Sequence, residues 1–243
     1  MGNTYDQLSA SLREISGLHP NISAVLMVTG HWEERAFAVA SNSQPPMVYD
    51  YGGFPPHTFQ IQYPAPGSPH LATQVKDLLG GAGLQANLND KRGFDHGVFV
   101  PMYVMYPNAD MPVVMLSLWR DLDVVAHLAA GRALTSLREQ GVLIIGSGSS
   151  YHNLRDFGPG AKTVSAQFDA WLSESVCNFN GSERNQRLLN WKTAPAAQAA
   201  HPREEHLMPL MVAAGAAENE VAVRNYHEDN FFGGISISGF KFG

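Results

Sequence analysis

Two histidines flank a pair of glutamates in HPREEHLMPL, residues 201–210, a stretch close in composition to the zinc-protease motif H-E-x-x-H. That motif spaces its histidines so that both imidazoles share one helix face and one metal ion. His201 and His206 are five residues apart, which turns them roughly 140° from each other on a helix. Pro202 favours a helix that begins there, with His201 outside it and His206 in its first turns. A metal bound by either histidine therefore needs ligands from elsewhere in the chain.

Three further histidines stand beside the ends of expected elements, where ligands bind in open α/β sheets. His31 follows the apolar run AVLMVTG and His152 follows VLIIGSGSS, so both should emerge at one edge of a sheet. His96 lies in GFDHG, a glycine-flanked loop that leads into a helix, and such glycines let the backbone approach a site closely. With His206, four of the ten histidines can converge on one site.

Each of these histidines also has an ordinary structural explanation. A histidine after a strand is often a hydrogen-bonded boundary residue, and His96 beside Asp95 can form a loop ion pair. The run GSGSS (146–150) matches neither the phosphate-loop spacing nor the G-x-S-x-G elbow of serine hydrolases. The other histidines have ordinary explanations as well. Four are expected on the surface or within helices: His19, His70, His127 and His227. His57 lies in a proline-rich loop, and His201 lies beside the glutamates.

Length and composition indicate one globular unit. A chain of 243 residues with 44% hydrophobic content can bury a large core, and we expect a single domain over residues 1–243. The net charge of −6, without a Lys/Arg cluster, argues against nucleic acid or membrane and favours a small-molecule partner. The one cysteine, Cys177, excludes an internal disulfide and a cysteine-rich zinc site. With no signal-peptide pattern and no membrane-length apolar stretch, a cytoplasmic protein is expected.

Apolar periodicity predicts strands that alternate with helices. Helices are expected over 4–17, 70–83, 124–141, 163–178, 184–190 and 203–215, and a short one after GFDHG. Strands are expected over 22–30, in RAFAVAS, LQANLN, MPVVMLSL and VLIIGSGSSYHN, and near 220–226 and 234–241. This pattern predicts an α/β fold with a mostly parallel central sheet and helices on both faces. The proline-rich segment 45–69 is too long for a plain connector, and we expect it to cover a site.

Seven motifs, in order along the chain, resemble the class III extradiol ring-cleavage dioxygenases (LigB-like), in the branch of 4,5-DOPA dioxygenases. They are VTGHW, DYGGFP, YPAPGSP, GFDHGVFVPM, MYPNADMPVVMLSL, GSGSSYHNLR and EEHLMPL. The resemblance implies a non-haem metal centre with one Fe(II) or Zn(II) per chain. It also implies insertion of both atoms of O2 into a small catecholic ring, beside its hydroxyl pair. Aromatic and proline residues of the 45–66 loop would then form an apolar wall over that ring.

The resemblance assigns a role to each of the four histidines. It makes His31 and His206 metal ligands, His152 the catalytic acid/base and a further ligand when zinc is bound, and His96 a pocket residue that contacts substrate or oxygen. Imidazole suits Fe(II) and Zn(II), and three facial ligands leave positions open for a catecholate and O2. A histidine with a near-neutral pKa can remove the second catechol proton and later return it.

One part of the family pattern has no counterpart in this sequence. Family members begin with an apolar strand that runs into an HG.P segment, whose histidine is the remaining metal ligand. This chain begins at MGNTYDQL, which aligns just after that segment. We therefore expect a sheet that lacks the N-terminal strand, an interior one, and favour a start placed too late over a genuinely short form.

Two other functions remain open at this stage. A non-catalytic binding protein on the same scaffold is one of them. The second is a zinc hydrolase that uses His31, His152 and His206 around an activated water. Oxygen uptake with a catechol distinguishes the dioxygenase from both.

Overall fold

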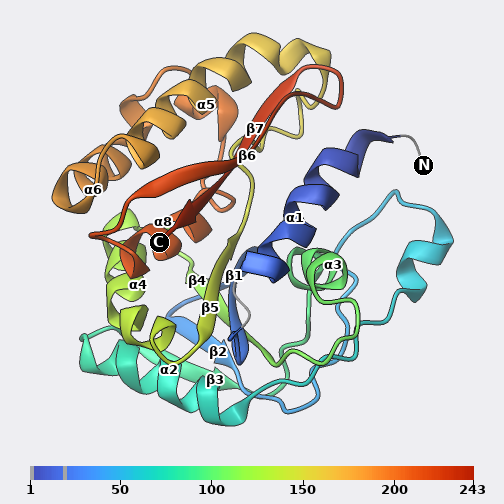
Figure 1. Ribbon diagram of the computed structural model, residues 1–243, viewed down its shortest axis with the longest axis vertical. Helices are drawn as coiled ribbons and strands as arrows, with labels where there is room; N and C mark the ends of the chain where they lie inside the picture. The colour runs from blue at the N-terminus through green and yellow to red at the C-terminus, as the bar shows by residue number, and fades with distance from the viewer. Residues whose placement is uncertain (1–2, 19–20) are drawn as a thin grey trace.

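The computed structural model describes residues 3–18 and 21–243, with a five-stranded sheet at its centre (Figure 1). The strands are β1 (Ala24–Glu34), β2 (Phe37–Ala40), β3 (Ala86–Asn89), β4 (Val113–Trp119) and β5 (Val142–Ser147), in the spatial order β3-β2-β4-β1-β5. β1 pairs in parallel with β4 and with β5, and β2 pairs in parallel with β3. The contact between β2 and β4 is antiparallel. The predicted α/β class with a mostly parallel sheet is confirmed.

Helices cover both faces of this sheet. They are α1 (Asp6–Leu18), α2 (Pro69–Gly81), α3 (His96–Met105), α4 (Val124–Arg138), α5 (Lys162–Cys177), α6 (Gly181–Leu189), α7 (Ala197–Ala200) and α8 (Met208–Ala216). Short 3-10 turns lie at Asn3–Tyr5, Pro56–Gln60, Pro159–Ala161 and Trp191–Thr193. Apolar residues of α2, α4 and α8 share one core with the sheet, and those of α3 share another. α1 packs against α3 (Figure 1).

The residue pattern of β1 explains why two separate cores form. Leu26 and Val28 are fully buried in the core with α4 and α8, whereas Val25 and Met27 are fully buried in the core with α3. Successive side chains of a strand point to opposite faces, so an unbroken apolar run is buried on both sides. The strand is thereby fixed at the centre of the molecule, and its carboxyl end is held rigidly.

The two closing strands were predicted correctly but lie outside the main sheet. β6 (Ala222–Phe231) and β7 (Ile235–Phe242) form a separate antiparallel hairpin that packs against α5 (Figure 1). The apolar residues Ile235 and Ile237 are buried, whereas much of β6 is exposed. The hairpin therefore covers α5 with one face and leaves the other face to solvent.

The helix expected over 203–215 begins later, at Met208, and this prediction was wrong. Pro209 occupies the first turn of α8, the position that the sequence analysis gave to Pro202. The apolar stretch from Met208 onward is buried against α4, and the polar residues before it form turns. Burial of the apolar residues thus decides where the helix starts, and His206 lies in the turn ahead of it.

The end of β1 also differs from the prediction. β1 does not end at Gly30 but continues to Glu34, with an irregularity in its pairing to β4 between Val28 and Glu33. Within the described part of the chain, β1 is hydrogen-bonded to β4 on one side and β5 on the other. β1 therefore lacks no neighbour there, and the absence of the family's N-terminal strand stays a prediction.

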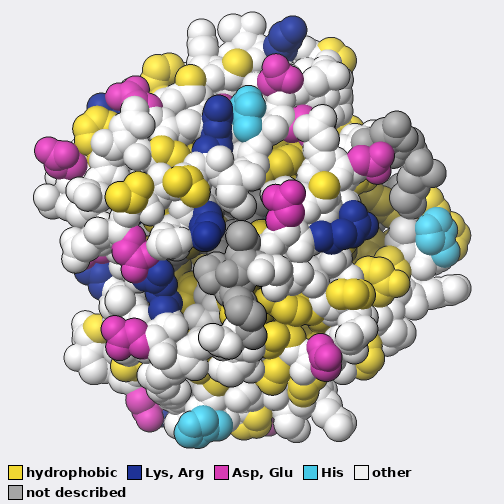
Figure 2. Space-filling view, viewed as in Figure 1, with side chains coloured by type: hydrophobic (Ala, Val, Ile, Leu, Met, Phe, Trp, Pro, Cys, Tyr) yellow, Lys and Arg dark blue, Asp and Glu magenta, His cyan; other side chains and the backbone are white. Residues whose placement is uncertain are grey.

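Charged side chains of both signs are mixed on the surface. On the face shown in Figure 2, Lys and Arg side chains lie scattered among Asp and Glu, with apolar side chains between them. No helix within residues 3–18 and 21–243 combines the length and apolar character that crossing a membrane requires.

His127 joins the end of β4 to the start of α4. Its ring is fully buried, so the prediction of a helical position holds and that of a surface position does not. Nδ1 donates to the carbonyl of Asp123 over 2.7 Å, and Nε2 accepts from the N–H of Trp119 over 3.2 Å. Both bonds need the neutral ring, and burial lowers the pKa of His127.

Replacing His127 by Gln is expected to weaken the pH dependence of folding. The folded-state pKa of His127 lies below its unfolded value of about 6.5, so the unfolded chain takes up the proton first as pH falls. The resulting stability is complete above about pH 6.5 and declines below it. Free energies of unfolding in urea at pH 7.5 and 5.5, without metal, should show a smaller loss in His127→Gln than in the wild type. His70→Gln, at an exposed position of α2, is the control, and equal losses in all three proteins would contradict this prediction.

Candidate metal centre and active site

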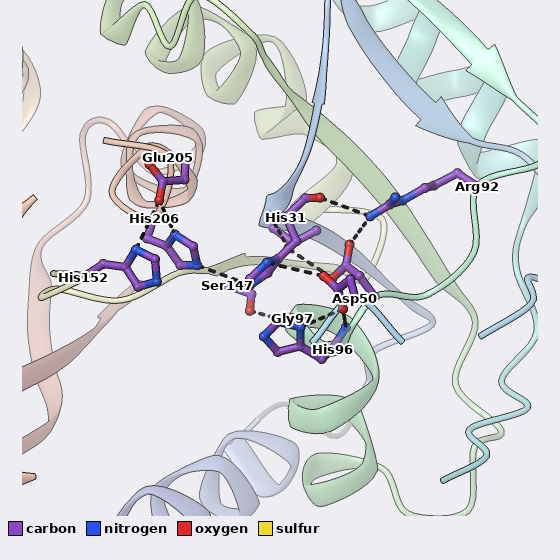
Figure 3. Close-up of polar contacts among 11 residues, drawn as sticks. His31, Asp50, Arg92, His96, Gly97, Ser147, His152, Glu205 and His206 are labelled. Atoms are coloured by element: carbon purple, nitrogen blue, oxygen red, sulfur yellow. Dashed lines mark hydrogen bonds and ion pairs between the residues drawn. The ribbon is translucent and has the colours of Figure 1, made fainter. Parts of the chain in front are cut away.

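The four histidines singled out from the sequence meet in space (Figure 3). His31 projects from β1, His96 is the first residue of α3, His152 follows β5, and His206 lies in the turn before α8. The ring centroid of His31 is 4.0 Å from that of His96 and 4.8 Å from that of His206. The rings of His206 and His152 stack with centroids 3.4 Å apart and planes inclined by 20°. The predicted convergence at the carboxyl edge of the sheet is present.

Three glycines allow this close approach. A Cβ at Gly30 would lie 3.2 Å from Cγ of His206, and one at Gly97 would lie 2.9 Å from Cδ2 of His31. A Cβ at Gly148 would collide with the carbonyl oxygen of His206. Only residues without a side chain let three segments pack this closely against His31 and His206.

Asp50 binds two of the histidines. Its Oδ1 accepts hydrogen bonds from Nδ1 of His96 over 2.7 Å and from the backbone N–H of His96 over 3.1 Å. Its Oδ2 lies 3.4 Å from Nδ1 of His31. The segment expected to cover a site thus contributes a carboxylate to it, and the sequence analysis missed this residue within the motif DYGGFP.

Glu205 contacts the other two histidines, as Asp50 contacts His31 and His96. Its Oε1 lies 3.1 Å from Nδ1 of His152 and 3.0 Å from Nδ1 of His206 (Figure 3). The side chain of Glu205 is only 14% exposed. The sequence analysis quoted EEHLMPL but assigned no role to its glutamates, because nothing in the sequence shows which of the two faces the histidines.

The two carboxylates determine which ring nitrogens are left for other contacts. When Nδ1 of His31 donates to Asp50 and Nδ1 of His206 donates to Glu205, each neutral ring presents a lone pair at Nε2. These two Nε2 atoms lie 3.2 Å apart. Two lone pairs at that distance repel unless a cation or a shared proton lies between them. Metal–nitrogen bonds of about 2.0–2.1 Å at a tetrahedral angle separate two ligand nitrogens by about 3.3 Å. The donor set therefore fits a divalent metal such as Fe(II) or Zn(II).

Burial keeps two of the four rings neutral. Burial, followed by the neighbouring charges of His96 and His206, lowers the pKa of His31 to about 3. Burial and the charge of His206 lower the pKa of His152 to about 4. These rings are therefore unprotonated at neutral pH, the form that binds metal. The near-neutral pKa expected of His152 as a catalytic acid/base is not found.

The pKa values of Glu205 and Asp50 shift in the direction that keeps both carboxyl groups ionised. Burial alone would raise the pKa of Glu205, but hydrogen bonding from His206 and the charges of His206 and His152 lower it to about 2. Burial likewise opposes ionisation of Asp50, and hydrogen bonds from His96 lower its pKa. Both groups are ionised acceptors for Nδ1–H donors over the physiological pH range.

An aromatic cluster borders His96. The ring of Tyr51 lies 5.4 Å from that of His96 and 5.0 Å from that of Phe59, centroid to centroid. The hydroxyl of Tyr51 donates to the carbonyl of Thr58 over 2.6 Å, which ties the two arms of the loop together. Phe54 packs edge-on against Tyr51 and is largely exposed. The loop thus presents apolar rings beside a hydrogen-bonding histidine.

The other predicted residues lie outside this cluster or have structural roles. The ion pair considered between His96 and Asp95 is absent from the described contacts, since Asp95 pairs with Arg92 over 2.5 Å. His201 is buried and donates from Nε2 to the carbonyl of Ser150 over 3.1 Å. Of the remaining four histidines, His19 lies outside the described ranges. His57 and His70 are exposed and have no role assigned above, and His227 pairs with Asp169.

Replacing Gly97 by Ala is expected to displace His31 and weaken metal binding. The new methyl group would lie 2.6 Å from Oγ1 of Thr29 as well as 2.9 Å from the His31 ring. We expect the affinity for Zn(II) to fall by about tenfold or more, as happens when contacts that orient a ligand are lost. Gly80→Ala in α2, where a Cβ meets nothing within 4 Å, is the control. Competition with a chromophoric chelator measures both, and unchanged affinity in Gly97→Ala would refute the packing argument.

Comparison with known proteins gives a consistent result. The family model for the catalytic LigB subunit of aromatic ring-opening dioxygenase matches residues 1–238. The 4,5-DOPA dioxygenase extradiol of Beta vulgaris is 40% identical over 226 residues, which cover 90% of this chain and 82% of the relative. The 4,5-DOPA dioxygenase extradiol of Escherichia coli (strain K12) is 31% identical over 231 residues, which cover 92% and 83%.

A solved structure supports the same assignment at the level of the fold. An uncharacterized protein from Escherichia coli K12 superposes with a TM-score of 0.81 at 28% sequence identity, covering 97% of this chain and 92% of that chain. The resemblance drawn from seven motifs is therefore confirmed over nearly the whole sequence. This chain belongs to the LigB family of aromatic ring-opening dioxygenases, whose members are metal-dependent enzymes.

Proposed function

We propose that this enzyme opens the ring of a small catecholic compound of the DOPA type, with one Fe(II) or Zn(II) ion held by His31 and His206, and by His152 as a further ligand only when zinc is bound. The observation that carries the metal assignment is the 3.2 Å separation of the Nε2 atoms of His31 and His206. His152 stacks on His206 and shares its carboxylate, so its Nε2 also faces away from Glu205. We place the whole described chain in one catalytic unit.

The bound metal would supply the Lewis acidity and oxygen activation that the reaction requires. The reaction is balanced without any other co-reactant, because both atoms of O2 enter the product. The carbon–carbon bond beside the hydroxyl pair breaks, and a carboxyl group and an aldehyde group replace it. The protein residues have to bind the catechol, accept its proton and exclude other orientations.

His152 is the base in this proposal. Its pKa of about 4 means that the ring is neutral at pH 7 and ready to accept a proton at Nε2. The carboxylate of Glu205, 3.1 Å from Nδ1, stabilises the imidazolium that results. The same ring can then return the proton when the oxygen–oxygen bond breaks.

His96 is the substrate-binding histidine. Its Nδ1–H is held by Asp50, so Nε2 remains for a catechol hydroxyl or for oxygen. About a third of its side chain is exposed, more than for the other three histidines. Tyr51 lies beside it, and Phe59 lies beside Tyr51; these rings offer faces and edges against which an aromatic ring packs at about 4.5–7 Å between centroids. The names of the relatives from Beta vulgaris and Escherichia coli support DOPA as the first substrate to test.

The direct test is oxygen uptake. The purified chain, loaded anaerobically with Fe(II), should consume one O2 per catechol and form a yellow ring-opened product from DOPA. Simple catechols without the amino-acid side chain show how much that side chain adds. Turnover of esters or amides without O2 uptake would instead favour a zinc hydrolase and refute the proposal.

Two substitutions should separate metal binding from substrate binding. His206→Ala removes one of the two facing Nε2 atoms, so we expect loss of Zn(II) binding and of activity together. His96→Ala should leave Zn(II) affinity within about twofold and lower turnover by about 10²- to 10⁴-fold, since it removes a positioned hydrogen-bonding group. Metal content and O2 uptake, measured on the same samples, distinguish the two. A metal-free His96→Ala protein would show that the roles assigned to the histidines are wrong.

A further inference from the structure

Glu205 is in contact with two histidines that the proposed function places in different roles. Its Oε1 atom is 3.0 Å from Nδ1 of His206, a proposed metal ligand, and 3.1 Å from Nδ1 of His152, the proposed base. We infer that Glu205 is the positioning residue of the site, which orients both imidazoles through a single carboxylate oxygen. This inference rests on the proposed function, because it concerns the histidines to which that function assigns metal and proton.

The surroundings of Glu205 hold it in place for this purpose. Its second oxygen, Oε2, is buried without a hydrogen bond and lies 3.5 Å from Nη1 of Arg203. Arg203 in turn binds Glu33 of β1 through two hydrogen bonds of 2.6 Å each. Glu33 of β1, Arg203 and Glu205 thus form a series of ion pairs that ends at the two histidines. The guanidinium of Arg203, 3.5 Å away, places a positive charge beside this carboxylate.

The packing around His206 fixes the position of its ring but not which ring nitrogen carries the proton. Gly30 and Gly148 lie against its ring and its carbonyl, so its place in the site is fixed by backbone contacts. These contacts are apolar or steric and do not choose between the two tautomers of the ring. A neutral histidine can carry its proton on either nitrogen, and the hydrogen bond at one nitrogen selects the tautomer. The carboxylate of Glu205 makes that selection for His206 and for His152 together.

A direct metal-binding role for Glu205 is the competing explanation. Glu205, His152 and His206 place possible ligand atoms within 4.8 Å of one another. Two observations speak against it. Nε2 of His206 faces His31, on the opposite side of the ring from Glu205. The guanidinium of Arg203 already lies beside the carboxylate, and a divalent cation there would be repelled by it.

Nitrogen-15 NMR of the metal-free protein tests the inference without any enzyme assay. At a pH where the imidazoles are neutral, the wild type should show His152 and His206 as Nδ1–H tautomers. Glu205→Ala should shift both toward mixtures rich in the Nε2–H form, while His31 and His96, held by Asp50, keep their state. If the tautomers of His152 and His206 are unchanged in Glu205→Ala, the inference is refuted.

Zn(II) affinity gives the second readout. Glu205→Ala should raise the Kd for Zn(II) by about 10- to 100-fold. Glu205→Gln keeps an acceptor oxygen and should recover most of that loss. Glu204→Ala is the matched control, since that side chain pairs with Lys192 over 2.7 Å instead, and it should bind like the wild type. Should Glu205→Gln lose Zn(II) as completely as His206→Ala, Glu205 is a ligand and the inference fails.

The two proposals fail in distinguishable ways. Thermal unfolding of the metal-free variants shows whether Glu205→Ala still folds, and Glu205→Gln preserves the shape of the side chain. A wild type that shows the expected tautomers and binds Zn(II), but opens no catechol ring, would contradict the proposed function. The positioning role of Glu205 would stand in that case.

Discussion

The approach of His31 to His206 is the contact on which the rest of the site depends. Their Nε2 atoms lie 3.2 Å apart although the two residues are separated by most of the chain. Two neutral imidazoles gain nothing from this arrangement by themselves, because both nitrogens carry lone pairs once Nδ1 is committed. The fold must therefore hold the two rings together, and the rigid elements that carry His31 and His206 do so.

The central strand provides one side of that support. β1 is buried on both faces and paired on both edges, so the position of His31 at its carboxyl end is fixed by the core. The irregularity between Val28 and Glu33 lies at this point, as is common where a strand re-aims a side chain toward a site. β5 runs parallel to β1 and delivers His152 to the same edge. The hydrogen bond from the N–H of His152 to the carbonyl of Ala200 joins that loop to the segment before His206.

Two carboxylates complete the arrangement, each shared by two histidines. Asp50 connects His31 with His96, and Glu205 connects His206 with His152. Shared acceptors make the four rings dependent on one another, since movement of one carboxylate affects two imidazoles. They also place negative charge around the cluster on two sides, which favours a cation at the centre. The loop that carries Asp50 therefore supports the site as well as covering it.

The sequence by itself determined the fold class and the four histidines. Continuous apolar runs such as AVLMVTG are buried on both faces of a sheet, and the residues that follow them emerge at its carboxyl edge, so His31 and His152 could be found from local pattern alone. Only the tertiary structure decided that α8 begins at Met208, that Asp50 and Glu205 bind the rings, and that His201 is buried elsewhere. These features depend on contacts between residues far apart in the chain, and short-range periodicity carries no information about which of two adjacent glutamates faces inward.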